Sequence, residues 1–281
     1  YASFMDDKSS SRIGLIAGEG EFPLILAKSL KSKGYSVYAV CFSKEQEKNL
    51  KELCEKVTRI YIGQLGKLIE TFKKDGVRDL VFLGKVDKSH ALRFSLPDFR
   101  ALRLWRSLRS REDNSLLTAL VEELEGLGFV VRGPAEFLSD YLTPEGVLTR
   151  REPTPEEWED IRYGLKIAKA IGDLDIGQCV LVKNRMTVAV EAMEGTDETI
   201  LRGGRLVSGA IVVKIAKPRQ DPRLDLPVVG YKTIETMVKA KAKVLALLAG
   251  KTFFLQREKA LELANKHGIA VCGVMDGGTE A

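Results

Sequence analysis

The sequence contains very little histidine and cysteine. Only His90 and His267 occur in 281 residues, so a histidine-rich metal site is excluded and a serine–histidine–aspartate triad is disfavoured. If the protein is an enzyme, carboxylates must transfer the protons, and any metal should be a hard, oxygen-liganded cation such as Mg²⁺. The scattered cysteines include no Cys-x-x-Cys pair and suggest neither a zinc site nor a disulfide framework. These are Cys41, Cys54, Cys179 and Cys272.

The sequence also has no apolar run long enough to cross a bilayer and no visible signal peptide. We therefore expect a cytoplasmic protein. A net charge of +5 suits an anionic small molecule or a membrane surface, and no nucleic-acid-binding motif accompanies it. Nucleic acid is therefore not an expected partner, and the chain length suits two domains.

The first half of the chain alternates predicted strands with helical patterns. Buried strands are predicted at residues 12–17, 36–42, 59–63 and 79–84. This alternation predicts an α/β fold class in which residues 12–133 form a Rossmann-like, doubly wound parallel sheet.

A glycine turn, Gly18-x-Gly20-x-x-Pro23, follows the first predicted strand. Small residues let the backbone approach a phosphate, the helix N-terminus favours an anion, and proline suits the first turn of a helix. NAD binding needs an acidic residue at the end of the second strand, and Glu45 comes too late for that role. The turn therefore indicates binding of a nucleotide other than NAD, or no ligand.

Residues 134–281 predict a second α/β domain with a mixed sheet. A capping box at Thr154–Glu157 starts a helix, and two short strands join in a hairpin at Asn184-Arg185. A long helical pattern is predicted from about Thr233 to Leu248.

An acidic stretch follows this hairpin. Glu191, Glu194, Asp197 and Glu198 occur within eight residues. One interpretation is structural: Thr196 caps a short helix whose first turn carries the last two acids. The other interpretation is a polar site at the edge of the sheet.

Residues 218–230, called the proline loop below, contain three prolines and follow an apolar strand-like run. The prolines exclude a helix and predict an extended, ordered loop. Alternation then places Asp221, Arg223 and Asp225 on one side and the leucines of the loop on the other. Two interpretations stay open. The loop presents its carboxylates to a cleft, or it is a surface turn with an internal Asp–Arg pair.

Residues 93–109 combine arginines with aromatic and aliphatic side chains at a spacing of three. Such a helix lies at a membrane interface, flanks an acyl-chain groove, or is an ordinary packed helix with a solvated face.

Several motifs together resemble a known family, the LpxI-type UDP-2,3-diacylglucosamine pyrophosphatases, from Ile13 to about Gly273. The most specific are Glu194-Gly-Thr-Asp197 and Gln220-Asp-Pro-Arg-Leu-Asp-Leu-Pro227. The chain departs from the family pattern at residues 87–88 and 111–114. The remaining motifs are Ile16-Ala-Gly-Glu-Gly-Glu-Phe-Pro23, Leu83-Gly-Lys-Val86, Asp175-Ile-Gly-Gln178 and Ala249-Gly-Lys251.

The resemblance implies cleavage of UDP-2,3-diacylglucosamine to UMP and 2,3-diacylglucosamine 1-phosphate (lipid X) in lipid A biosynthesis. It further implies a Mg²⁺ or Mn²⁺ cofactor, substrate or lipid product bound between two domains, peripheral association with the inner membrane, and a homodimer. The alternative is a nucleotide-sugar or lipid-binding protein without catalysis.

We assign candidate roles on both grounds. Asp225 is the first candidate for metal ligand or orienter of the attacking water, Asp221 is the second, and Glu194 and Asp197 would support the metal. The candidate substrate-binding residues are Gly18, Gly20, Pro23, Lys85, Gln178, Thr196, Arg202, Lys214, Arg223 and Thr233.

Overall fold

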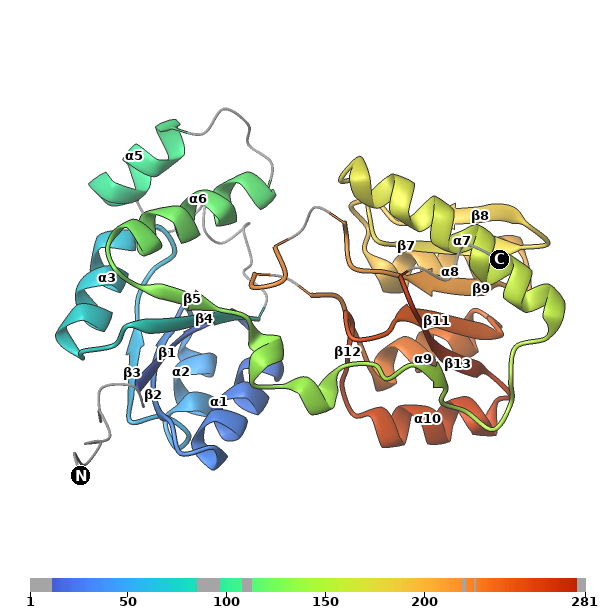
Figure 1. The fold of residues 1–281 in the computed structure, drawn as a ribbon, viewed down its shortest axis with the longest axis horizontal. Coiled ribbons are helices and arrows are strands. Elements are labelled where there is room, and N and C mark those ends of the chain that lie inside the picture. The colour runs from blue at the N-terminus through green and yellow to red at the C-terminus, as the bar shows by residue number, and fades with distance from the viewer. Residues whose placement is uncertain (1–11, 85–96, 108–112, 219–220, 225, 277–281) are drawn as a thin grey trace, which may run out of the picture. The chain divides into compact units, whose positions relative to one another are not determined.

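The computed structural model describes residues 12–84, 97–107, 113–218, 221–224 and 226–276. The chain forms two compact units. The N-terminal unit contains Tyr1–Leu138 and Asp221–Asp225, and the C-terminal unit contains Ser139–Gln220 and Leu226–Ala281. The predicted fold class is confirmed, because the first unit contains a parallel sheet and the second a mixed one (Figure 1).

The sheet of the N-terminal unit has the order β3-β2-β1-β4-β5, and all of its strand pairs are parallel. The chain moves outward from β1 to β3 and then returns to the other side of β1 with β4. Ligands of doubly wound folds bind at the carboxyl ends of the strands flanking such a switch point. The strands are β1 (Arg12–Ala17), β2 (Ser36–Cys41), β3 (Lys56–Arg59), β4 (Asp79–Leu83) and β5 (Val130–Arg132).

Helices cover both faces of this sheet (Figure 1). On one face, Leu68 and Phe72 of α3 and Leu124 of α6 are buried against Ile16 and Leu80 of the sheet. The first group comprises α1 (Phe22–Ser32) and α2 (Lys44–Leu50). The second comprises α3 (Leu65–Lys74), α5 (Phe99–Ser107) and α6 (Asp113–Gly126), and a 3₁₀ turn, η2 (Pro134–Glu136), follows β5.

The third strand begins and ends earlier than predicted. The predicted strand at 59–63 is wrong, because β3 pairs with β2 from Lys56 to Arg59. Gly63 has a φ of +96° and lies in the turn before α3. Ile60 and Ile62 follow the last paired residue, Arg59, so the apolar pattern in the sequence continues after the strand has ended.

The sheet of the C-terminal unit has the order β6-β13-β11-β9-β7-β8. The strands β9, β11 and β13 are mutually parallel, and β6, β7 and β8 join by antiparallel pairing. A separate parallel pair is formed by β10 and β12. The bounds are β6 (Gly146–Val147), β7 (Cys179–Lys183), β8 (Met186–Val190), β9 (Ile211–Lys214), β10 (Val228–Val229), β11 (Val244–Leu248), β12 (Phe253–Phe254) and β13 (Ala270–Val274).

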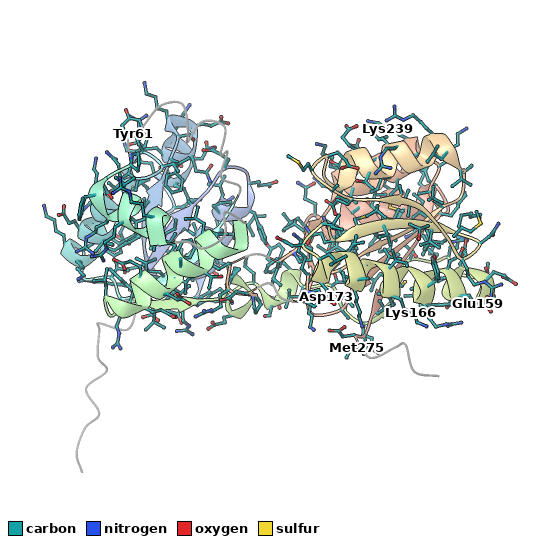
Figure 2. The ribbon with its side chains drawn as sticks, turned by 90° about the horizontal axis from the view of Figure 1, so that it is seen from above. Tyr61, Glu159, Lys166, Asp173, Lys239 and Met275 are labelled. Atoms are coloured by element: carbon teal, nitrogen blue, oxygen red, sulfur yellow. The ribbon has the colours of Figure 1, made fainter. Side chains whose placement is uncertain are left out.

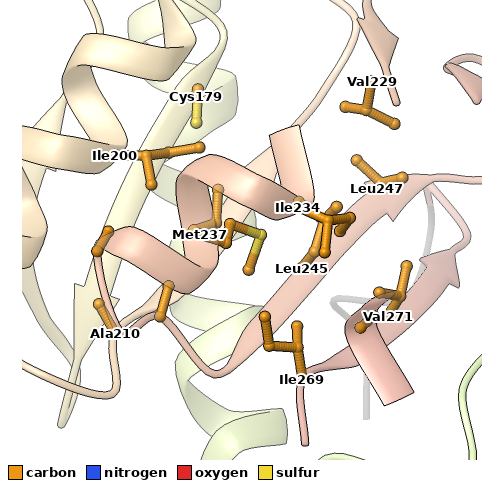
Figure 3. Close-up of a cluster of buried hydrophobic side chains, with 14 of the residues drawn as sticks. Cys179, Ile200, Ala210, Val229, Ile234, Met237, Leu245, Leu247, Ile269 and Val271 are labelled. Atoms are coloured by element: carbon orange, nitrogen blue, oxygen red, sulfur yellow. The ribbon is translucent and has the colours of Figure 1, made fainter. Parts of the chain in front are cut away.

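One long helix covers one face of this sheet, and three shorter helices cover the other. Ile161 and Leu165 of the long helix are buried against Val213. Ile234 and Met237 lie in the opposite cluster with Leu245 and Leu247 (Figure 3). The long helix is α7 (Pro155–Asp173), the shorter ones are α8 (Thr196–Leu206), α9 (Tyr231–Lys239) and α10 (Arg257–Lys266), and a 3₁₀ turn, η3 (Ser139–Tyr141), precedes β6.

The predicted helix from Thr233 to Leu248 is wrong in its second half. The helix α9 ends at Lys239, Lys241 adopts a left-handed φ of 54°, and residues 244–248 form β11. This strand lies between β9 and β13 and is buried throughout. A fully buried strand has no polar alternation, so its sequence resembles a helix that continues.

The hairpin predicted at Asn184-Arg185 is confirmed and is held by a buried carboxylate. Both residues have left-handed φ values, 51° and 57°, as in a type I′ turn. Asp160 on α7 is 5% exposed and accepts hydrogen bonds from both backbone N–H groups, at 2.9 and 2.5 Å. The carboxylate therefore ties the hairpin to the helix that covers the sheet.

Asp160→Asn is expected to destabilise the protein by about 2 kcal/mol, because the amide group would face one backbone N–H donor with another donor. Urea unfolding followed by circular dichroism measures this loss. The matched control is Glu159→Gln on the same helix (Figure 2), because the ion pair of Glu159 with Arg185 is long and exposed. We expect no resolvable change in the control, and equal losses in both variants would contradict the role of Asp160.

Candidate functional site

The glycine turn of the N-terminal unit lies at the switch point of its sheet. Gly18, directly after β1, donates from its N–H to the carbonyl of Leu83 at the end of β4, at 2.8 Å. Gly84 has a φ of +102°, and a Cβ there would lie 2.7 Å from Cγ of Pro23 and 2.8 Å from the carbonyl carbon of Gly18. The two loops therefore touch where only a glycine fits.

The backbone beyond this contact is held in place and has open space beside it. Gly20 has a φ of +100°, and its carbonyl accepts a hydrogen bond from Nε2 of Gln46 at 3.2 Å. Apart from its two chain neighbours, no described residue has an atom within 4 Å of where its Cβ would be. Pro23 lies in the first turn of α1, as predicted. The turn thus leads into a helix N-terminus at the edge where this fold class binds phosphates. Lys85 lies outside the described residues.

The C-terminal unit has a polar row at the carboxyl edge of its own sheet. Cys179, the first residue of β7, pairs in register with Lys214, the last residue of β9. Glu191, directly after β8, donates from its N–H to the carbonyl of Cys179 at 2.9 Å. The three residues therefore cross three neighbouring strands, and residues directly opposite one another share a face of the sheet.

The two charged members of this row are almost completely buried. Glu191 and Lys214 are each 6% exposed. The Glu191 carboxylate accepts hydrogen bonds from the Gln178 N–H at 3.2 Å and from the Thr196 hydroxyl at 3.0 Å. Nζ of Lys214 donates to the carbonyl of Val228 at 3.0 Å. Across the part of the chain that the structure describes, no carboxylate lies within ion-pair distance of Lys214.

A buried ammonium whose hydrogen-bond partner is a neutral carbonyl is costly, so it marks a candidate site for an anion. Cys179 lies between the two charges. Burial raises the pKa of its thiol, the Glu191 carboxylate raises it further, and the Lys214 ammonium opposes the rise. The thiol is therefore protonated at neutral pH and acts as a small, inert neighbour of both groups.

The start of α8 differs from the prediction. Gly195, with a φ of +82°, precedes the helix, and no side chain caps it. The predicted cap by Thr196 is wrong, because Thr196 is the first helical residue and its hydroxyl donates to Glu191 instead. A cap would need Thr196 directly before the helix, with its oxygen accepting from a helix N–H, but Gly195 occupies that position, and the Thr196 hydroxyl makes a charge-assisted hydrogen bond to the buried carboxylate.

Glu194 and Asp197 of this stretch are paired with cations. Glu194 accepts from Nη2 of Arg202 at 2.6 Å. Its own backbone N–H and then Arg202 lower the pKa of this carboxyl. Asp197 lies 3.4 Å from Nζ of Lys232 on the first turn of α9. The starts of α8 and α9 are thus linked beside the buried row.

Two further candidates belong to the same unit. Gln178, directly before β7, has a buried Oε1 that accepts no hydrogen bond from any described group. Thr233 is 8% exposed, and its hydroxyl accepts from the N–H of Gly230 at 3.3 Å, which caps α9. The buried Oε1 of Gln178 therefore needs a hydrogen-bond donor, which a ligand or a water molecule could supply.

Seven candidates from the sequence therefore lie in the C-terminal unit around one sheet edge, and Glu191 was missed. The sequence carried one signal for it, a charged residue directly after a predicted strand. Three further acids follow within eight residues, so the sequence did not distinguish Glu191 from them. The seven are Gln178, Glu194, Thr196, Asp197, Arg202, Lys214 and Thr233.

Residues 221–224 of the proline loop form a turn rather than the predicted extended chain, whereas Val228 and Val229 of the same loop are extended and form β10. The N–H of Leu224 donates to the carbonyl of Asp221 at 3.0 Å. Oδ1 of Asp221 accepts from the N–H of Arg223 at 2.9 Å, so the side chain of Asp221 closes the turn. The turn is favoured over an extended chain because the carboxylate of Asp221 can accept a hydrogen bond from the backbone N–H two residues later.

The same carboxylate also binds the guanidinium of Arg223 along one edge. Nε and Nη2 of Arg223 donate to it at distances between 2.7 and 3.1 Å. These bonds lower the pKa of the Asp221 carboxyl and raise that of the Arg223 guanidinium. The internal Asp–Arg pair of the second interpretation is therefore present. Asp225 lies outside the described residues.

The described carboxylates do not fit a metal ion by themselves. No group of three or more histidine, cysteine, aspartate or glutamate side chains in the described ranges could hold one. Both oxygens of Asp221 already accept hydrogen bonds from Arg223. The described carboxylates therefore do not form a complete metal site.

The two sheets and their polar edges define the class of this protein, an α/β protein of two units with a Rossmann-like N-terminal unit. Residues 12–141 match the LpxI N-terminal domain, and residues 144–272 match the LpxI C-terminal domain. The chain therefore belongs to the LpxI family, and the resemblance seen in the sequence is confirmed.

A relative from Caulobacter vibrioides, named UDP-2,3-diacylglucosamine pyrophosphatase LpxI, is 31% identical over 277 residues, covering 94% of this chain and 97% of the relative. The protein is accordingly an enzyme of the hydrolase class. A solved biotin carboxylase domain of a thermophilic 2-oxoglutarate carboxylase matches 61% of this chain and 34% of its own, at 10% identity and a TM-score of 0.26. Similarity at that level supports no conclusion about this protein.

Among the helices in the described ranges, none combines the length and apolar character of a membrane span.

Proposed function

We propose that the protein hydrolyses the pyrophosphate bond of UDP-2,3-diacylglucosamine, releasing UMP and 2,3-diacylglucosamine 1-phosphate for lipid A biosynthesis. The observation that carries this proposal is the match to a relative of that name over nearly the full length of both chains. Both domains of the family are matched, so the proposal does not depend on one shared module.

The residues of the C-terminal unit support this chemistry. Hydrolysis of a phosphoanhydride requires positive charge beside the developing phosphate anions and a water aligned with the phosphorus. Lys214 supplies a buried ammonium that no described carboxylate neutralises. The buried Oε1 of Gln178 would accept a hydroxyl or N–H of the substrate. Thr196, oriented by Glu191, presents its oxygen to the same region.

Further roles are proposed on the sequence motifs. Asp225 would orient the attacking water and accept its proton. Gly18 and Gly20 would bring backbone groups to the nucleotide phosphate. Arg202 and Lys85 would contact phosphate oxygens. Arg223 could do so only in competition with the two carboxylates that its guanidinium already binds.

A divalent cation, Mg²⁺ or Mn²⁺, is proposed as cofactor. When bound, it would polarise a phosphoryl oxygen and neutralise charge. We also propose a homodimer that associates with the inner-membrane surface. For membrane binding, α5 offers Arg103, which is 66% exposed, and Phe99, which is 80% exposed.

Incubation of the purified protein with UDP-2,3-diacylglucosamine and Mg²⁺ is expected to release UMP and the lipid phosphate in equal amounts. Excess EDTA should abolish the release, and added Mg²⁺ or Mn²⁺ should restore it. Mass spectrometry of the products measures both effects. Tight binding of the substrate without UMP release at any metal concentration would contradict the proposal and favour a binding protein.

A further inference from the structure

One short part of the proline loop, residues 221–225, belongs to a different unit from the rest of that loop. Residues 221–225 group with the N-terminal unit, whereas the chain before and after them groups with the C-terminal unit. We infer that Glu125, near the end of α6, is a positioning residue that holds residues 221–224 against the N-terminal unit, directly before Asp225 in the sequence. This inference rests on the proposed function, because Asp225 is the catalytic group proposed there.

The charged part of this attachment uses both edges of one guanidinium. Nη1 of Arg223 donates to Oε1 of Glu125 at 2.7 Å, and these residues are 98 positions apart in sequence. The opposite edge of the guanidinium binds Asp221. A planar donor held by carboxylates on two sides is fixed in orientation as well as position. Glu125 thus connects the closed turn to α6.

An apolar contact acts beside the charged one. Leu224 packs against the buried cluster formed by α3, α6 and the sheet of the N-terminal unit. Gly133 lies against the same turn, since a Cβ there would be 3.6 Å from Cα of Arg223. Asp225 is the next residue in the sequence, so the described turn ends one residue before the proposed catalytic group.

The Glu125–Arg223 ion pair is exposed enough that its loss should affect the rate more than the stability of the fold. The side chains of Arg223 and Glu125 are 37% and 40% exposed. Pairs this exposed contribute little to the free energy of unfolding. A catalytic group displaced by about 1 Å can nevertheless lower a rate by about 100-fold. Loss of Glu125 should therefore change the loop and the rate more than the stability.

The test compares Glu125→Lys and Glu125→Gln with Glu122→Lys, a matched charge reversal at an exposed position on the same helix. Amide hydrogen exchange is measured on a peptide that covers residues 221–224, and kcat and KM are measured with UDP-2,3-diacylglucosamine. Glu125→Lys should speed exchange in this peptide about 10-fold or more. It should lower kcat by about 10- to 100-fold, change KM less, and leave the thermal midpoint unchanged.

Glu125→Gln should give an intermediate result, because its amide oxygen can still accept from Nη1 of Arg223. Wild-type exchange and wild-type kcat in Glu125→Lys would overturn the inference. Equal effects in Glu122→Lys would also overturn it, by assigning the change to the charge of α6. An inactive wild-type protein would count against the proposed function alone, and the exchange comparison would still decide whether Glu125 holds the loop.

Discussion

Replacement of Asp225 by alanine is expected to lower the rate of UMP release by about 10²- to 10⁴-fold, the range for loss of one acid–base group. The reason is chemical. With only two histidines in the chain, a carboxylate must orient or deprotonate the attacking water. Asp225→Asn should lose a comparable amount, since the amide keeps the shape and removes the basic oxygen. Steady-state kinetics at saturating substrate measures both variants.

The control for this prediction is Asp140→Ala, which removes an exposed carboxylate from the C-terminal unit. It should keep the wild-type rate, and circular dichroism should show all variants folded. Full activity in a folded Asp225→Ala protein would remove the catalytic role proposed for the proline loop.

Replacement of Lys214 by methionine is expected to lower kcat/KM by about 10²- to 10³-fold, the effect of losing one preorganised group that stabilises transition-state charge. The thermal midpoint should stay the same or rise. Methionine fills a similar volume without burying an ammonium, and in the wild type Lys214 is 6% exposed and its ammonium donates to a backbone carbonyl. A gain in stability with a loss of activity is typical of functional sites.

Lys239→Met is the matched control, because Lys239 is exposed on α9 (Figure 2). It should change neither quantity. If Lys214→Met is instead as active as the wild type, the buried ammonium is not part of the site. If it unfolds at a much lower temperature, Lys214 serves the fold, and its bond to Val228 is the contact to examine next.

The parts of the fold that the sequence predicted well depend on residues close together in the chain. The capping box of Thr154 and Glu157 forms as predicted, with both reciprocal hydrogen bonds present. Pro23 lies in the first turn of α1, and the Asn184-Arg185 hairpin forms between two short strands. Each of these features is decided within four or five residues, so composition and spacing are sufficient.

The candidate site was predicted in part. The sequence selected Gln178 and Lys214, and the structure brings both to one edge of the sheet. It could not select Glu191 as their neighbour, because strand pairing decides that Cys179 lies between Glu191 and Lys214. Thr196 was assigned to a helix cap because helix N–H donors are close in sequence, but the helix begins at Thr196 itself and its hydroxyl donates to Glu191.

The sequence by itself determined the α/β class, the starts of α1 and α7, and the family. The tertiary structure alone decided which residues meet, because pairing of β7 with β9 and docking of residues 221–224 onto the N-terminal unit join positions far apart in the chain. The Glu125–Arg223 ion pair follows from that docking. No local periodicity encodes it, since its free energy depends on two surfaces that form only when the whole chain has folded.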